Sequence, residues 1–370
     1  MSILDSLQSA FSGLGSKKDS FVGIDIGSSA IKVVQLKKEK GRILLDTYGE
    51  VALGPYQKED GVAGELTNLE IEPLTKAIKN LLSQANVTAT NALISISSAT
   101  SLIFILKVPQ ISQRELSGVI QNEARKYIPV PLTEVSLDYW MIPKNESYSD
   151  DHSGSSKDST IDVLVAAVRN EVVTRYNTVS KSLSFNDIQY EIETFSALRG
   201  SLKHELSPVM IIDLGASGTR MSIVEHGVVR KFRAISRGSA YISSSLQKSF
   251  EIPFKEAEAM KREIGLDKSA TNSEAYNVIE VGTEYIFSEL KNVIFDFEKE
   301  YKKPISKIIL TGGGALLKNI QPTIEARFNI NTVHANPFSK ALSPEFLEDV
   351  LRQAGPEFAV ATGLALQGLE

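Results

Sequence analysis

The chain contains two stretches with the same order of apolar and polar positions. Each is an apolar β-rich run, an Asp-x-Gly turn, a second β-rich run, a polar turn with glycine and a third strand, at residues 21–49 and 209–235. Lys32 and Arg220 each lie seven residues after their turn aspartate, Asp25 or Asp213. Two widely separated copies exclude a short-period solenoid and predict two similar α/β domains that face each other.

Apolar periodicity predicts the other elements of each domain. After the first copy, residues 72–85 have helical spacing and residues 91–97 read as a strand. After the second copy come helical segments at 240–250 and 253–264, a long helix near 277–301, a buried strand at 305–310 and a helix of small residues from 356. The small side chains of that last helix predict close packing against another helix.

Residues 101–183 interrupt the first domain and predict a separate inserted unit. The pattern gives strands at 102–108, 135–142 and 161–168 and helices at 112–126 and 171–183, in a βαββα order. Residues 143–160 are polar and lack apolar periodicity, so they predict a mobile loop.

Composition narrows the class of protein. With 370 residues, 42% hydrophobic and 23% charged, the chain is typical of a soluble globular protein of two or three domains. A net charge of -5 argues against a nucleic-acid partner. The absence of cysteine excludes disulfides, thiolate zinc sites and cysteine nucleophiles, and the four histidines are too dispersed for a metal cage.

The chain shows no pattern of a membrane span or a cleaved signal peptide. Residues 1–20 do form an amphipathic segment, whose apolar side chains line one side of a helix: Ile3, Leu4, Leu7, Phe11 and Leu14. A helix folded back on the protein's own surface and an arm for a partner or a membrane face both fit this pattern.

Both Asp-x-Gly turns have the residue types that bind a nucleotide triphosphate. The glycine- and serine-rich segments let backbone N–H groups converge on phosphates; they are Gly27-Ser28-Ser29 and Gly215-Ala216-Ser217-Gly218. Asp25 and Asp213 are placed to hold hydrated Mg²⁺, Asp213 also to orient water, and Lys32 adds a charge for the β-phosphate. One such turn alone would be a satisfied turn aspartate, but two in matching contexts favour a site.

Two further motifs fit an adenosine pocket. Gly312, Gly313 and Gly314 let the backbone lie flat against a base or ribose, although a plain strand-to-helix corner also fits. The spacing matches neither a Walker A loop nor a Rossmann fingerprint. Glu258 and Lys261 lie on one helix face and suit ribose hydroxyls and a purine, or form an ordinary surface ion pair.

These motifs resemble the actin, heat-shock chaperone and sugar kinase superfamily. The resemblance implies a duplicated, actin-like (ribonuclease H-like) two-domain α/β fold, phosphate loops at 25–32 and 213–220, and an adenosine motif from Thr311 to Leu317. It also implies interdomain helices at 193–199 and 358–364. By the same resemblance, Glu193 positions the attacking water, with Asp213 as its catalytic companion, and the cofactors are ATP and Mg²⁺.

Within the superfamily the chain is most similar to the PilM family of type IV pilus assembly proteins. The residues that carry this resemblance are the segments 21–34, 123–130, 336–338 and 358–366. The family implies a cytoplasmic scaffold that binds ATP with at most slow hydrolysis and is recruited to the inner membrane. Its implied partner is the N-terminal peptide of a PilN-like membrane protein; pilus motor ATPases and weak self-association are further expectations.

The PilM resemblance implies a division of the chain and a place for that peptide. The implied parts are an N-terminal segment (1–20), subdomain 1A (21–100), an FtsA-like 1C insertion (101–183), a return to 1A (184–204), 2A (205–240), 2B (241–300), 2A again (301–355) and a second interdomain helix (356–370). The peptide is expected in a groove between 1A and 1C, flanked by Leu116, Ile120, Tyr127, Ile128, Pro129 and Val130. The alternative is that Ile128, Pro129 and Val130 only close the 1C core.

Two rival functions share the fold. An FtsA-like division protein would end in a linker and a membrane-binding helix, whereas the sequence stops a few residues after its second interdomain helix. A sugar or acetate kinase needs an acceptor pocket with a base, and no motif indicates one. The sequence therefore favours a nucleotide-binding scaffold over both.

Overall fold

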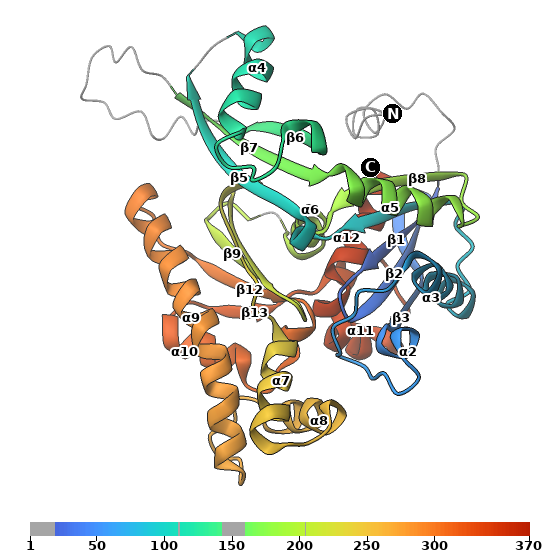
Figure 1. Ribbon diagram of the computed structural model, residues 1–370, viewed down its shortest axis with the longest axis vertical. Helices are drawn as coiled ribbons and strands as arrows, with labels where there is room; N and C mark the ends of the chain where they lie inside the picture. The colour runs from blue at the N-terminus through green and yellow to red at the C-terminus, as the bar shows by residue number, and fades with distance from the viewer. Residues whose placement is uncertain (1–18, 110–111, 143–159, 204) are drawn as a thin grey trace.

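The computed structural model describes residues 19–109, 112–142, 160–203 and 205–370. The amphipathic segment of residues 1–18 and the polar loop of residues 143–159 lie outside this part of the chain. Within it, two five-stranded sheets stand next to each other and a three-stranded sheet lies at one end of the molecule (Figure 1). The fold is mixed α/β, as the periodicities predict.

The first five-stranded sheet has the order β3-β2-β1-β4-β8. Its strands are β1 (Ser20–Ile26), β2 (Ala30–Glu39), β3 (Arg42–Ala52), β4 (Asn91–Ile96) and β8 (Asp187–Ile192). Strands β1 to β3 form an antiparallel meander, while β4 and β8 join it in parallel. Helices α2 (Gly54–Gln57), α3 (Ile71–Gln84) and α5 (Asn170–Lys181) belong to this half, and α3 and α5 pack on one face of the sheet.

The second five-stranded sheet repeats this topology in the order β11-β10-β9-β12-β13. Its strands are β9 (Val209–Leu214), β10 (Thr219–Glu225), β11 (Val228–Ile235), β12 (Lys307–Thr311) and β13 (Thr332–His334). Again a meander of three strands is extended by two parallel strands. The internal sequence repeat therefore corresponds to two copies of one sheet.

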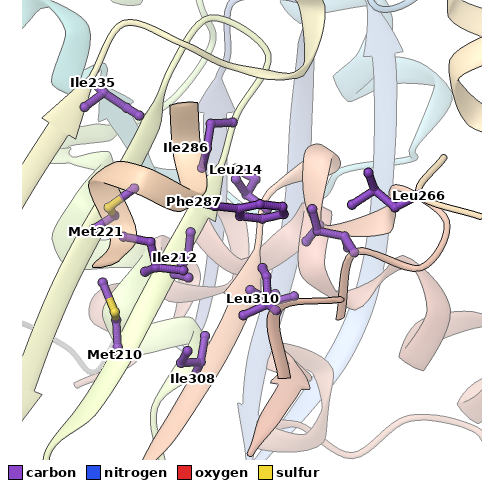
Figure 2. Close-up of a cluster of buried hydrophobic side chains, with 14 of the residues drawn as sticks. Met210, Ile212, Leu214, Met221, Ile235, Leu266, Ile286, Phe287, Ile308 and Leu310 are labelled. Atoms are coloured by element: carbon purple, nitrogen blue, oxygen red, sulfur yellow. The ribbon is translucent and has the colours of Figure 1, made fainter. Parts of the chain in front are cut away.

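Helices α7 (Ser239–Phe250), α8 (Phe254–Ile264), α9 (Ser273–Tyr301) and α10 (Ile320–Phe328) complete the second half. Figure 2 shows its core, where side chains from β9, β10 and β12 meet Ile286 and Phe287 of α9. Because this core is continuous from the strands to the helices, it fixes the ends of β9 and β12 relative to each other.

The three-stranded sheet has the order β5-β7-β6, with β5 (Ser101–Pro109), β6 (Val135–Ile142) and β7 (Thr160–Arg169), and carries helix α4 (Gln113–Ala124). Its core holds Leu116 and Ile120 of α4. The expected second helix of this unit is α5, which contacts β7 of the small sheet and also packs against α3 of the first half.

Helices α6 (Glu193–Ser201) and α12 (Ala359–Leu369) pack against each other. Their contact requires glycine, because a Cβ on Gly200 would collide with the carbonyl of Ala359 and one on Gly363 with the carbonyl of Ser196. The small residues of α12 thus allow the close packing against another helix that their pattern predicts. The remaining elements are α11 (Glu348–Ala354) and the 3₁₀ turns η1 (Ser98–Thr100), η2 (Leu132–Glu134), η4 (Gly313–Leu316), η5 (Pro337–Lys340), η6 (Glu345–Leu347) and η7 (Gly355–Phe358).

None of the helices in the described ranges combines the length and apolarity of a bilayer span.

Candidate functional site

A cavity of about 330 Å³ separates the two five-stranded sheets where β1 and β9 end. Nearly all the residues expected to bind nucleotide line it: Asp25, Gly27, Ser28, Ser29, Lys32, Glu193, Asp213, Gly215, Ala216, Ser217, Glu258, Lys261, Gly312, Gly313, Gly314 and Leu317. Gly218 is the exception and does not line the cavity. It faces β11 instead, where a Cβ on this residue would meet the carbonyl of Ile235. This volume lies in the range of small-molecule sites.

The first turn connects β1 to β2 and is closed by the backbone N–H of Gly27, which donates to the carbonyl of Ala30. The carboxylate of Asp25 accepts a 2.9 Å hydrogen bond from the hydroxyl of Ser95. That hydroxyl in turn accepts from the backbone N–H of Ile26, so β4 holds both the turn and its aspartate.

The second turn repeats this geometry between β9 and β10. The N–H of Gly215 donates to the carbonyl of Gly218, as that of Gly27 does to Ala30 in the first copy. Helix α7 starts against this turn, because the N–H groups of Ser239 and Ala240 donate to the carbonyls of Gly215 and Ala216. The turn is therefore held by its own sheet and by a helix.

The two turn aspartates lie in an environment that disfavours negative charge. Burial, then repulsion from Glu193, raises the pKa of Asp25 to about 7. Burial also raises the pKa of Asp213 to about 6, although the Arg220 guanidinium opposes it. A bound divalent cation would relieve this repulsion, and carboxylate oxygens are the ligands that Mg²⁺ prefers, so the residues present fit the ion.

Lys32 lies beside the first turn and is 13% exposed. Its ammonium is 3.2 Å from the carboxylate of Glu50, its cross-strand neighbour in β3. Burial alone would lower the pKa of Lys32, but Glu50 and then Glu357 outweigh it and raise the pKa. The side chain therefore stays charged where it lines the cavity beside the first turn.

Glu193 opens helix α6 at the floor of the cavity. One of its oxygens lies 2.8 Å from the Arg220 guanidinium and accepts a 2.8 Å hydrogen bond from the backbone N–H of Ser98. Asp213 is 3.9 Å from the same guanidinium. Glu193 thus reaches the cavity as expected, but already in an ion pair.

Glu258 and Lys261 of α8 form a buried pair, 8% and 5% exposed, so the alternative of an ordinary surface pair is wrong. The carboxylate of Glu258 accepts from the Lys261 ammonium at 2.7 Å, the Ser243 hydroxyl at 2.6 Å and the Arg262 guanidinium at 2.8 Å. Burial would raise the pKa of Glu258, but Lys261 and these hydrogen bonds outweigh it and lower the pKa. A charged carboxylate is thereby held at the cavity wall.

The glycine run at the end of β12 lies directly under the second turn. Gly312 has φ +81°, and a Cβ there would lie 2.5 Å from the Asp213 carboxylate. Gly314 approaches the carbonyl of Leu214 in the same way. The glycines therefore form the strand-to-turn corner that the sequence allows, and their use by a base or ribose stays a prediction.

Sequence reasoning did not identify Ser95, Glu50, Ser243, Arg262 or Glu357 as parts of this site. Ser95 is a fully buried polar residue between two isoleucines of β4, which is a usable signal, and it faces Asp25 because β4 lies parallel to β1. Burial raises the pKa of Glu357, and nothing in its local sequence sets it apart.

A second cavity, of about 630 Å³, lies where the three-stranded sheet meets the two larger ones. It is lined by β6 and β8, each an edge strand of its sheet, and by Phe195 and Arg199 of α6. Trp140 of β6 lies 5.3 Å from Phe195, ring centre to ring centre, and is 40% exposed.

The six residues expected to flank a peptide groove do not line this second cavity. Leu116, Ile120 and Ile128 are buried in the core of the small sheet and do not line a surface groove. Tyr127 is exposed and stacks on Phe104, Pro129 is exposed, and Val130 packs against the core. The apolar face of α4 reflects core packing, which is the commoner use of that pattern.

Comparisons with known proteins agree with this architecture. The family model described as type IV pilus assembly protein PilM matches residues 23–369. The cell division protein FtsA of Buchnera aphidicola subsp. Baizongia pistaciae (strain Bp) is 23% identical over 85% of this chain and 83% of its own length.

Two solved structures show the same fold. The PilM–PilN type IV pilus biogenesis complex has a TM-score of 0.77 at 23% identity, over 94% of this chain and 98% of its own. MreB5 of Spiroplasma citri, bound to AMPPNP, has a TM-score of 0.52 at 14% identity, over 94% and 95%. The actin-like fold is thereby confirmed.

Proposed function

Because this chain belongs to the PilM family of type IV pilus assembly proteins, we propose that it is an ATP-binding scaffold for the assembly platform at the cytoplasmic face of the inner membrane. One ligand is ATP, bound between the two halves, and the other is the N-terminal peptide of a PilN-like membrane protein, which recruits the scaffold to the membrane.

The observation that carries the ATP site is the meeting of two equivalent turns from the two halves at one cavity. Residues of both glycine- and serine-rich turns line the same space, and turns of this kind can offer backbone N–H groups to phosphate oxygens. Asp25 and Asp213 would hold Mg²⁺ through water, and the positive charge of the ion would offset the repulsion at these buried carboxylates. Glu258 and Lys261 would meet the ribose and the purine.

The second cavity supports the partner site. Its lining includes β6 and β8, which are edge strands of the described sheets, and the outer edge of such a strand can hydrogen-bond an extended peptide. Trp140, Phe195 and Ile192 give it apolar surface for side chains of such a peptide. We therefore place the groove between subdomains 1A and 1C on β6 and β8 rather than on α4. The PilM relative of known structure is a complex with PilN.

Trp140 is the chain's single tryptophan, and of the two cavities it lines only the second. A change in its fluorescence therefore distinguishes binding of the peptide from binding of ATP. A synthetic peptide of the PilN-like protein's N-terminus should change Trp140 emission and bind in calorimetry. Trp140→Asp should abolish that heat, while Phe346→Ala, which removes an exposed ring far from the groove, should not.

Fluorescent ATP binding should be lost in Asp25→Ala and Asp213→Ala, both of which should still bind the peptide. Unchanged nucleotide affinity in both variants would refute the ATP site. Peptide binding that survives Trp140→Asp would refute the groove.

A further inference from the structure

Arg220 links the two halves of the protein across the floor of the nucleotide cavity. It belongs to β10 of the second half, and its guanidinium lies 2.8 Å from Glu193, the first residue of α6, beside the first half. Both side chains are only 9% exposed. An ion pair this well shielded is screened little by salt and holds a fixed geometry.

The same carboxylate oxygen of Glu193 is held from further directions. The backbone N–H of Ser98 donates to it at 2.8 Å, and the hydroxyl of Ser97 at 3.5 Å. Arg220 is fixed in turn by the carbonyl of Gly218 at 3.4 Å. Neither side chain can therefore turn toward a ligand without breaking this network.

The internal repeat shows that this contact is not a by-product of the turn motif. Lys32 holds the equivalent position in the first copy and pairs within its own sheet, with Glu50. On the side where Lys32 meets Glu50, Arg220 faces Ala234, which offers no charge. Its guanidinium lies 3.9 Å from Asp213, its other cross-strand neighbour, and makes its shorter contact, 2.8 Å, outside its sheet with Glu193.

We infer that the Arg220–Glu193 pair is a latch that keeps the two halves at one closure and keeps Glu193 from orienting water, so that bound ATP is retained rather than hydrolysed. This inference rests on the proposed ATP site. In hydrolysis, a water oxygen bonds to the γ-phosphorus, the bond to the bridging oxygen breaks, and the water proton passes to a base or a phosphate oxygen. A carboxylate tied to Arg220 is not available to position that water.

The test compares phosphate release and ATP binding in three variants. They are Arg220→Ser, Arg220→Lys and the double variant that combines Arg220→Ser with Glu193→Gln. Arg220→Ser should release phosphate at least tenfold faster than the unaltered protein, since a freed positioning carboxylate contributes about 100-fold or more. Lysine keeps the charge and should restore slow release, and the double variant should return to the original rate. Arg230→Ser removes another buried arginine, which pairs with Glu225 away from the cavity, and should not change the rate.

A second readout follows the two halves directly. The chain has no cysteine, so cysteines introduced at the exposed positions Glu59 and Lys268 can carry a dye pair without background labelling. We expect one distance with or without ATP in the unaltered protein, and a broader, ATP-dependent distribution in Arg220→Ser. If that variant does not fold, Arg220→Gln, whose uncharged polar side chain is closer in size to arginine than serine is, replaces it.

The outcomes separate the two proposals. Normal ATP binding in Arg220→Ser with unchanged or slower phosphate release, or an unchanged distance distribution, overturns the latch and leaves the ATP site standing. If the unaltered protein binds no ATP, the site itself is wrong and the latch falls with it.

Discussion

Replacing Asp25 by asparagine tests how strongly the buried surroundings of this residue destabilise its ionised carboxylate. Burial and the nearby Glu193 raise the pKa of Asp25 from its ordinary 3.8 to about 7. Below pH 4 the carboxyl is protonated in both the folded and the unfolded chain. Between pH 4 and 7 only the unfolded chain releases the proton, so rising pH favours unfolding by up to about 1.4 kcal/mol per unit.

The full difference would be about 4 kcal/mol at pH 8. Because Asp25 borders a cavity that admits water, we expect about half of it, roughly 2 kcal/mol. Asparagine cannot ionise and can still accept the Ser95 hydrogen bond, so Asp25→Asn should be more stable than the unaltered protein at pH 8 and about equal at pH 4. It should also bind Mg²⁺-ATP at least tenfold more weakly.

Thermal unfolding without nucleotide at both pH values measures this difference. We expect the Tm of Asp25→Asn to be higher by a few degrees at pH 8 only. Asp60→Asn, on an exposed loop, is the matched control and should change Tm at neither pH. A lower Tm of Asp25→Asn at pH 8, or equal Tm differences at both pH values, would refute the electrostatic argument.

Gly363→Ala should prevent folding or lower Tm by many degrees, because the added methyl group would collide with the carbonyl of Ser196. The control Gly118→Ala, on the open face of α4, should keep or slightly raise Tm. Glu258→Gln leaves Lys261 buried without its counter-charge, so calorimetry should show about tenfold weaker ATP binding and thermal unfolding a lower Tm. Chelating Mg²⁺ should weaken fluorescent ATP binding more at pH 8 than at pH 5, because the two turn aspartates are ionised at pH 8 and then repel phosphate; equal losses would contradict this.

Local patterns in the sequence were sufficient for much of the fold. The alternation of apolar positions placed the two meanders, and helical spacing placed α3 and α9 to within a few residues. The repeated Asp-x-Gly turns predicted two equivalent sheets, since a turn's backbone geometry depends mainly on its own residues. The nucleotide-site residues identified from these motifs also reach one cavity, apart from Gly218.

Helix α4 shows where local patterns are ambiguous. Leu116 and Ile120 form an apolar helix face, and the same pattern serves a core or a binding surface. Only the packing of α4 on its sheet decides that these side chains are buried. Trp140 lies in β6, and only the position of this strand at a sheet edge brings it to the second cavity.

The sequence by itself determined the repeated sheets, the turn chemistry and the family resemblance, because each is encoded in neighbouring residues. Tertiary structure alone decided that Ser95 holds Asp25, that Glu50 pairs with Lys32, and that Arg220 crosses the cavity to Glu193. Those contacts depend on strand register and on how the two halves close. Both are set by the summed packing of distant segments, which no short motif records.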